Sequence, residues 1–169
     1  MMLVSDSKYG FRCDKNTMSL TLIRGSYDPD PYPEYGVHNI RIGFGAACNA
    51  RARTLYNARD VFVHPMSMCS SRSGKGQLAL DGSLLKAGPS ILVGALKNAE
   101  DKDGFVVRLF EAEGRDNSFT LEFAKDIAEA YETDINERTV SEIGFDGRKI
   151  NGDIKANCIK TVYIKLKNT

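Results

Sequence analysis

The sequence contains no tryptophan, only two histidines and few cysteines. The histidines, His38 and His64, are not paired in an H-x-H or H-x-x-x-H spacing, and no two cysteines form a C-x-x-C pair. A zinc site needs such groupings, and disulfide frameworks need denser cysteines, so we expect neither. We expect reduced thiols in a cytoplasmic protein. The cysteines are Cys13, Cys48, Cys69 and Cys158.

The sequence also has no marked excess of positive or negative residues. Lys and Arg number 23 and Asp and Glu number 22, giving a net charge of +1. This balance argues against a nucleic-acid partner. The apolar runs are too short to span a membrane, the mean hydropathy is −0.31 and the first residues do not resemble a signal peptide. We therefore expect no membrane association.

What the sequence does contain is strand-like alternation. Apolar and polar residues alternate with period two, which is typical of half-buried strands. The run from Ser90 to Leu96 is apolar on both faces and predicts a more buried strand. The alternating runs are residues 18–23, 39–44, 105–110, 118–123 and 162–167.

Turn residues separate these runs at short intervals. The pairs Asp146-Gly147 and Asn151-Gly152 favour hairpin turns with positive φ. Further turns are expected at residues 15–16, 102–104 and 114–117. Short strands without long helices between them predict an all-β fold, an antiparallel β-sandwich with one or two short helices. We expect one such domain over residues 1–169.

Three stretches are less regular. Residues 46–60 have high helix propensity and a weak apolar stripe, so we expect one short helix there. Residues 125–137 fit a helix by propensity and a strand by the even spacing of their apolar residues, and we favour the strand. Residues 69–76 have the composition of a loop.

The segment Tyr27–Gly36 is unusual because prolines occupy three alternate positions, 29, 31 and 33. Proline fixes φ and lacks a backbone donor, so the segment should be extended and unpaired. It would display two aspartates and three tyrosines. A rigid crossover between strands and a loop that faces a sugar or a neighbouring domain both remain open.

Glu111 and Glu113 form a carboxylate pair on one strand face. Glycoside hydrolysis needs two carboxyl groups on opposite sides of the scissile bond, which neighbours on one strand cannot easily provide. We therefore expect salt bridges or sheet-edge charges from them. On residue pattern alone, His38 and His64 are structural.

Several blocks in the chain are similar, in the same order, to segments of one enzyme family. Asp6–Phe11 resembles its D-x-K-Y-G segment, and Met18–Arg24 resembles its M-x-L-x-L-L-R strand. Pro29–Pro31 and Gly36–His38 resemble P-D-P and G-x-H, and Val107–Arg115 is similar to L-R-L-Y-E-A-E-G-R. The family is glycoside hydrolase family 38, the α-mannosidases.

The resemblance covers only the C-terminal β-rich part of those enzymes. Their catalytic α/β barrel lies upstream and holds the nucleophilic aspartate and a zinc ion, and no segment here matches it. The resemblance thus implies a C-terminal domain, or a truncated reading frame, that is inactive alone and has no cofactor of its own. Glu34 stands where the family usually has an aspartate.

The first functional hypothesis is that this chain packs on the catalytic domain of an α-mannosidase that acts on mannose-containing glycans. The family's β domain contributes a basic side chain near the active site. Arg24 and Lys8 are the matching candidates, and Tyr9 is a stacking partner. Asp30 and His38, in the matching blocks, are further pocket or docking candidates. Arg24 could also merely cap its strand.

The second hypothesis is a stand-alone carbohydrate-binding sandwich without turnover. Such a module needs exposed aromatic rings, and the tyrosines at positions 27, 32 and 35 form the one cluster of this kind in the sequence. Under the first hypothesis, the face that docks on the barrel would be exposed in this chain. We expect that face to contain residues 6–9, Arg24 and residues 27–35, and to favour a homo-oligomer.

Overall fold

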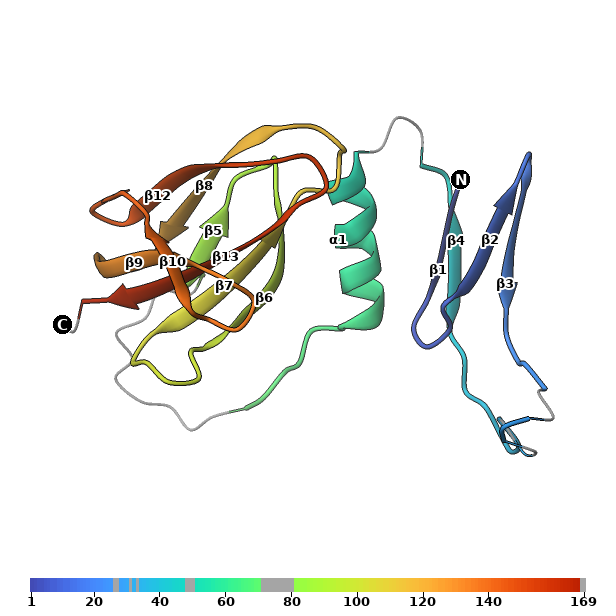
Figure 1. Cartoon of the computed structure of the whole chain (residues 1–169). Helices are drawn as coiled ribbons and strands as arrows, with labels where there is room; N and C mark the ends of the chain where they lie inside the picture. The colour runs from blue at the N-terminus through green and yellow to red at the C-terminus, as the bar shows by residue number, and fades with distance from the viewer. Residues whose placement is uncertain (26–27, 31, 33, 48–50, 71–80, 168–169) are drawn as a thin grey trace. The chain divides into compact units, whose positions relative to one another are not determined.

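The computed structural model describes residues 1–25, 28–30, 32, 34–47, 51–70 and 81–167 (Figure 1). The chain divides into two compact units, Met1–Ser70 and Ser71–Thr169. The expected arrangement was a single sandwich over residues 1–169. Among the described residues, the strands of the first unit pair only with one another, and the strands of the second unit form separate sheets.

The first unit contains two antiparallel strand pairs and a helix. Strand β1 (Met2–Ser5) pairs with β4 (Ile42–Gly45), and β2 (Gly10–Asp14) pairs with β3 (Thr17–Thr21). Lys15 adopts a φ of 50° between β2 and β3, which confirms the turn predicted there. Helix α1 (Ala52–Val63) confirms the predicted helix, although it begins and ends later than the expected 46–60.

The β1–β4 ribbon packs against α1 through its glycine-containing face. A Cβ atom on Gly43 would lie 2.9 Å from Val4 Cγ1 and 3.2 Å from Phe62 Cε2, so only glycine permits this approach. Arg41 reinforces the contact. Its Nε donates to Asp6 Oδ2 at 2.9 Å, its Nη2 donates to the Phe62 carbonyl at 3.1 Å, and its guanidinium stacks over the Phe62 ring.

The predicted buried face of β4 is wrong. Alternation suggested that Ile42 and Phe44 face a core, yet they are 43% and 86% exposed. Because the Gly43 side of the strand lies against α1, the apolar side chains occupy the opposite, open face.

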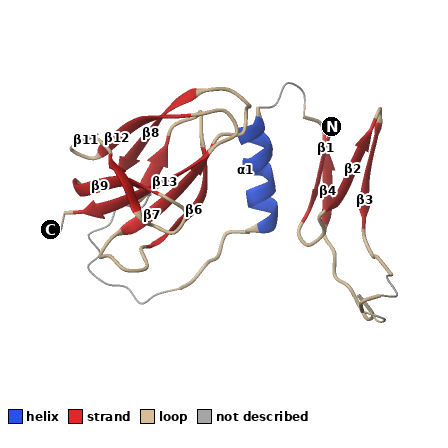
Figure 2. Cartoon of the chain, viewed as in Figure 1, coloured by secondary structure: helices blue, strands red, loops and turns tan. Residues whose placement is uncertain are grey.

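The second unit is a sandwich of two antiparallel sheets (Figure 2). A five-stranded sheet has the order β10-β9-β13-β7-β6, and a four-stranded sheet has the order β11-β12-β8-β5. The strands are β5 (Leu85–Ala87), β6 (Leu92–Asn98), β7 (Phe105–Phe110), β8 (Asn117–Phe123), β9 (Ile127–Thr133), β10 (Thr139–Glu142), β11 (Phe145–Asp146), β12 (Lys149–Ile154) and β13 (Ile159–Leu166).

Alternate residues of these strands fill the space between the sheets. The predicted half-buried alternation is confirmed in β8. Strands β7 and β13 also place every second residue in the core, but Val106, Thr161 and Tyr163 are buried on their other face. The strand favoured for residues 125–137 is confirmed as β9, and the all-β sandwich is confirmed for this unit. The buried residues include Val107, Leu109, Phe119, Leu121, Phe123, Ile127, Ile150, Ile154, Val162 and Ile164.

Two predictions for this unit are wrong in detail. Strand β6 is not a buried central strand but an edge strand, and Leu96 on it is 42% exposed. Asn151-Gly152 is not a turn but lies within β12, opposite Phe119 of β8. By contrast, the predicted turn at Asp146-Gly147 is confirmed, with Gly147 at a φ of 54°.

Candidate functional site

Three of the predicted site residues meet around Glu34 in the first unit. Lys8, in the loop after β1, places its Nζ 2.6 Å from Glu34 Oε1. The backbone N–H of Arg24, which follows β3, donates to Glu34 Oε2 at 2.8 Å. His38 Nε2 lies 2.5 Å from the carbonyl oxygen of Glu34. One residue, noted in the sequence only as a departure from the family pattern, thus joins three separate segments.

The geometry around Glu34 stabilises its ionised form. The hydrogen bond from the Lys8 ammonium, followed by the one from the Arg24 N–H, lowers the pKa of Glu34 below its ordinary value of 4.5. The Lys8 side chain is only 13% exposed, whereas that of Glu34 is 35% exposed. We call this set the Glu34 cluster: Lys8, Arg24, Glu34 and His38.

Within the Glu34 cluster, Arg24 contributes its backbone N–H but not its side chain. Lys8 is engaged with Glu34, but the exposed guanidinium of Arg24 has no hydrogen bond or ion pair with any residue that the structure describes. The planar guanidinium can make bidentate bonds to a carboxylate or to adjacent hydroxyls. Arg24 is therefore the group of the Glu34 cluster best able to contact a partner.

The remaining candidates, Tyr9 and Asp30, lie outside the cluster. Tyr9 is 83% exposed. Asp30 Oδ1 accepts a hydrogen bond from the N–H of Tyr32 at 3.0 Å, which closes a local turn. Tyr32 and Tyr35 are exposed and meet edge to face, with ring centroids 6.4 Å apart. Tyr27, Pro31 and Pro33 lie outside the described residues, as do residues 71–76 of the predicted loop.

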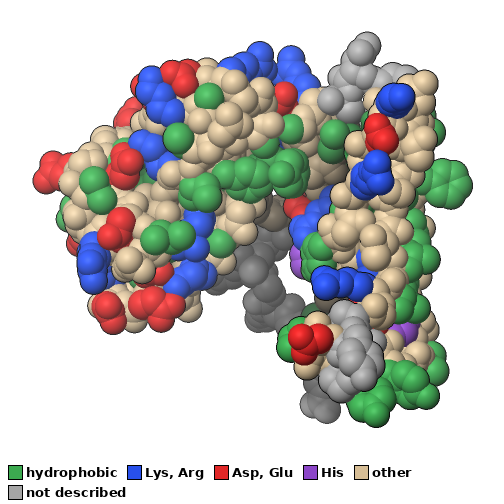
Figure 3. All heavy atoms as spheres, turned by 45° about the vertical axis from the view of Figure 1, so that its right-hand side comes forward, with side chains coloured by type: hydrophobic (Ala, Val, Ile, Leu, Met, Phe, Trp, Pro, Cys, Tyr) green, Lys and Arg blue, Asp and Glu red, His purple; other side chains and the backbone are tan. Residues whose placement is uncertain are grey.

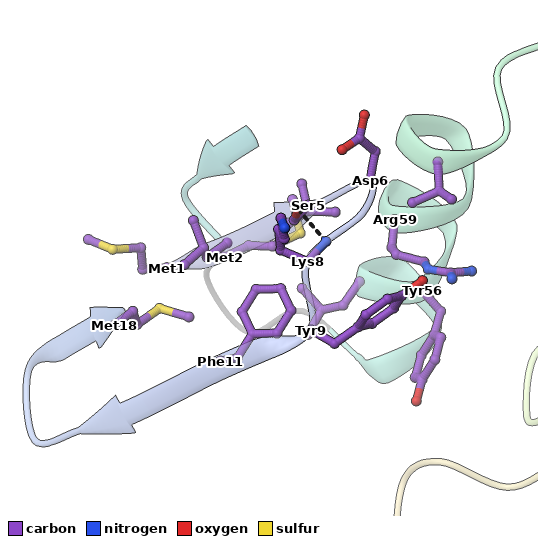
Figure 4. Close-up of a pocket in the computed structure, with 14 residues that line it drawn as sticks. Met1, Met2, Ser5, Asp6, Lys8, Tyr9, Phe11, Met18, Tyr56 and Arg59 are labelled. Atoms are coloured by element: carbon purple, nitrogen blue, oxygen red, sulfur yellow. Dashed lines mark hydrogen bonds between the residues drawn. The ribbon is translucent and has the colours of Figure 1, made fainter. Parts of the chain in front are cut away.

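A hollow of about 410 Å³ lies between β1, the β2–β3 hairpin and α1 (Figure 4). Its walls are mostly apolar, with Tyr9, Phe11 and Tyr56 among them. Asp6 is the only carboxylate among the described residues that line it, and it is paired with Arg41. This hollow therefore lacks the two carboxyl groups that glycoside hydrolysis requires.

The zinc of the family 38 enzymes does not fit the residues described here. Among residues 1–25, 28–30, 32, 34–47, 51–70 and 81–167, no three His, Cys, Asp or Glu side chains are grouped closely enough to hold a metal ion. Within the same ranges, no helix has the length and apolar character needed to cross a membrane.

The comparison with protein families gives one match. Residues 90–162, from two residues before β6 into β13, match the family described as the glycosyl hydrolases family 38 C-terminal beta sandwich domain. No curated protein matches the chain. The recognition made from the sequence blocks is thus confirmed for the second unit, where Val107–Arg115 lies.

The family match does not extend to the candidate site residues. The candidates Lys8, Tyr9, Arg24, Asp30 and His38 all precede residue 90, outside the matched segment. Their roles still rest on the resemblance of the N-terminal blocks, and only Lys8, Arg24 and His38 share the geometry of the Glu34 cluster.

Within the family 38 sandwich domain, Glu111 has a structural position that the sequence did not reveal. It is 3% exposed, and its carboxylate accepts N–H hydrogen bonds from the following turn and from the turn before β13. The expected salt bridge or sheet-edge role of Glu111 is wrong. The signal in the sequence was Gly114, which adopts a φ of 72° and allows the turn to wrap around the carboxylate. The donors are the N–H groups of Glu113, Gly114, Arg115 and Asn157 and the side-chain amide of Asn117.

Proposed function

We propose that the chain is the β-rich part of a family 38 α-mannosidase, which packs on a catalytic domain that supplies the nucleophile and the zinc. The observation that supports this most strongly is the family 38 sandwich domain at residues 90–162. The substrate class would be terminal α-mannosides of glycans. The chain alone would not hydrolyse them.

In this proposal the Glu34 cluster holds the docking surface in shape. Lys8 and the Arg24 N–H fix Glu34, so the segment before β4 is tied to the loop after β1 and to the end of β3. The Arg24 guanidinium and the Tyr9 ring, both exposed, remain available to the catalytic domain or to a sugar hydroxyl. Arg24 would act as a positioning residue at the rim of the sugar pocket.

The test is to produce the chain together with a family 38 catalytic domain from the same genome. We expect the two to co-purify, and we expect turnover of an aryl α-mannoside by the pair but not by the chain alone. Arg24→Glu should weaken the association at least about tenfold, because a contact to a charged partner is reversed in sign. It should leave the melting temperature unchanged, since exposed charges contribute little to stability.

Arg115→Glu is the matched control, because Arg115 is also exposed but lies in the other unit. It should change neither association nor turnover. Failure of the chain to bind the catalytic domain would contradict the proposal. So would equal binding by the Arg24 and Arg115 variants.

The exposed rings of Tyr32 and Tyr35 favour the second candidate, a carbohydrate-binding module without turnover. In that case mannosides should shift the amide signals of Tyr32 and Tyr35 in the chain alone, and Tyr35→Ala should abolish those shifts without a catalytic domain present. We further propose a cytoplasmic location, where the exposed thiols of Cys13, Cys69 and Cys158 would remain reduced.

A further inference from the structure

The outer face of the five-stranded sheet, opposite the core, is covered by two loops of the same unit. Residues 99–104 join β6 to β7, and residues 134–138 join β9 to β10 (Figure 1). Tyr163 of β13 lies on this face and is only 3% exposed, and its hydroxyl donates to the Asp103 carbonyl at 2.9 Å. Arg108 of β7 donates from Nη2 to the Ile135 carbonyl at 3.2 Å. Both loops are thus fixed to the sheet.

The two loops are also fixed to each other. Lys97 Nζ lies 2.8 Å from Glu137 Oε1, and the N–H of Glu100 donates to Glu137 Oε2 at 2.8 Å. Lys102 Nζ donates to Thr139 Oγ1 at 3.1 Å. A hollow of about 500 Å³ between the loops is therefore preformed, which is the usual state of small-molecule sites.

The walls of this hollow are polar and contain charges of both signs. They include Asp101, Lys102, Asn136, Glu137, Arg138 and Tyr163. Glu137 is neutralised by Lys97. The side chains of Asp101, Asn136 and Arg138 form no hydrogen bond or ion pair with any residue in the described ranges. They offer acceptors, an amide and a guanidinium to whatever enters.

The charged and polar groups in the wall of the hollow favour some classes of ligand over others. An apolar ligand would strip water from charged groups without replacing its hydrogen bonds, which is costly. A small anion would meet the Asp101 carboxylate, and a cation would meet Lys102 and Arg138. A neutral ligand with many hydroxyl groups can donate to Asp101 and accept from Arg138 and Lys102 at the same time.

We propose that the hollow between residues 99–103 and 134–138 is a non-catalytic saccharide site for one sugar residue. It goes beyond the function proposed above, because it lies within the sandwich unit and needs no catalytic domain. A sugar bound there would hold a glycan to the enzyme without being cleaved.

The experiment is an NMR titration of the full, ¹⁵N-labelled chain with methyl α-mannopyranoside, methyl α-glucopyranoside and inorganic phosphate in parallel. We expect at least one saccharide to shift the amide signals of residues 99–103 and 134–139 in a saturable way. Arg138→Ala should weaken that binding about tenfold, as expected for the loss of a charge-assisted hydrogen bond. Asp101→Asn is a second variant that should also weaken it.

Arg148→Ala is the control, because Arg148 is exposed and lies in the β11–β12 turn of the same unit. It should bind the saccharide as the unmodified chain does. Shifts at these residues with phosphate but with neither sugar would overturn the proposal in favour of an anion site. No saturable shift with either saccharide, or equal binding by the Arg138, Asp101 and Arg148 variants, would also overturn it. None of these outcomes depends on whether the chain docks on a catalytic domain.

Discussion

At the scale of single residues, the buried carboxylate of Glu111 stabilises the fold. Glu111 is buried, and four backbone N–H groups and one amide satisfy its charge in place of a cation. Hydrogen bonds to the ionised form, first among them the one from the Asn157 N–H, lower the pKa of Glu111 below its ordinary value of 4.5. The turn after β7 and the turn before β13 therefore depend on one negative charge.

We predict that Glu111→Gln destabilises the sandwich unit. An amide nitrogen would face backbone donors that it cannot accept from, which leaves buried N–H groups without partners. The melting temperature should fall by at least about 5 °C for a unit of this size. Differential scanning calorimetry measures this directly. Glu113→Gln is the control, because its backbone N–H rather than its carboxylate joins the network, and it should have little effect.

The stabilisation by Glu111 should depend on pH. Because the folded-state pKa of Glu111 is lowered, its stabilisation is fully present above about pH 4.5 and is lost as the pH falls toward the folded-state value. The difference in melting temperature between the unmodified chain and Glu111→Gln should therefore be constant near neutral pH and shrink below pH 4.5. A difference that is independent of pH would mean that the charge of Glu111 is not what the turns require.

For Glu34, we predict that Glu34→Gln loosens the link to Arg24. The amide cannot pair with the Lys8 ammonium as the carboxylate does, so the Arg24 N–H should exchange with solvent about tenfold faster. Hydrogen exchange followed by NMR measures this single amide. Asp30→Asn is the matched control in the same segment, since Asp30 bonds only the nearby Tyr32 N–H in the described structure. Equal protection of Arg24 in both variants would show that Glu34 does not hold it.

At the scale of elements, the sequence predicted strands well where apolar residues recur at every second position. Strands β7, β8 and β13 place every second residue in the core, so their period is visible in the chain itself. The wrong predictions concern positions whose conformation depends on a residue far away in the sequence. Asn151-Gly152 has the preference of a turn, but Phe119 lies opposite and requires glycine there. The Lys8–Glu34 and Glu111–Asn157 contacts join residues 26 and 46 positions apart, which no local pattern reveals.

Strand β12 offers a test of that explanation. A Cβ on Gly152 would lie 2.8 Å from Phe119 Cζ, in a packed core where the ring has little room to move. Gly152→Ala should therefore destabilise the unit by about 1–3 kcal/mol, as overpacking does. Chemical denaturation measures the loss. Gly144→Ala, where nothing lies within 4 Å of the new methyl group, should be close to neutral. A neutral Gly152→Ala would mean that β12 and β8 can separate without cost.

At the scale of the whole molecule, the two units differ in how far their apolar side chains are exposed to solvent. The sandwich unit buries a contiguous core, whereas the first unit exposes Tyr9, Tyr35, Val37 and Phe44 at more than 80% each. The space-filling view shows hydrophobic side chains at the surface of the first unit and charges of both signs scattered over the second (Figure 3). Exposed apolar groups on this scale are typical of an interaction surface.

If that surface has no catalytic domain to cover it, a second copy of the chain can do so. We predict a concentration-dependent oligomer, and we predict that Phe44→Ser raises the dissociation constant at least about tenfold, because an aromatic anchor is lost from the contact. The melting temperature should barely change, since Phe44 is already 86% exposed. Val140→Ser is the matched control, because Val140 is also exposed but lies on β10 of the sandwich unit. Sedimentation velocity over a range of concentrations measures both variants. A chain that is monomeric at every concentration would contradict self-association, and equal dissociation constants for the two variants would place the contact elsewhere than on the open face of β4.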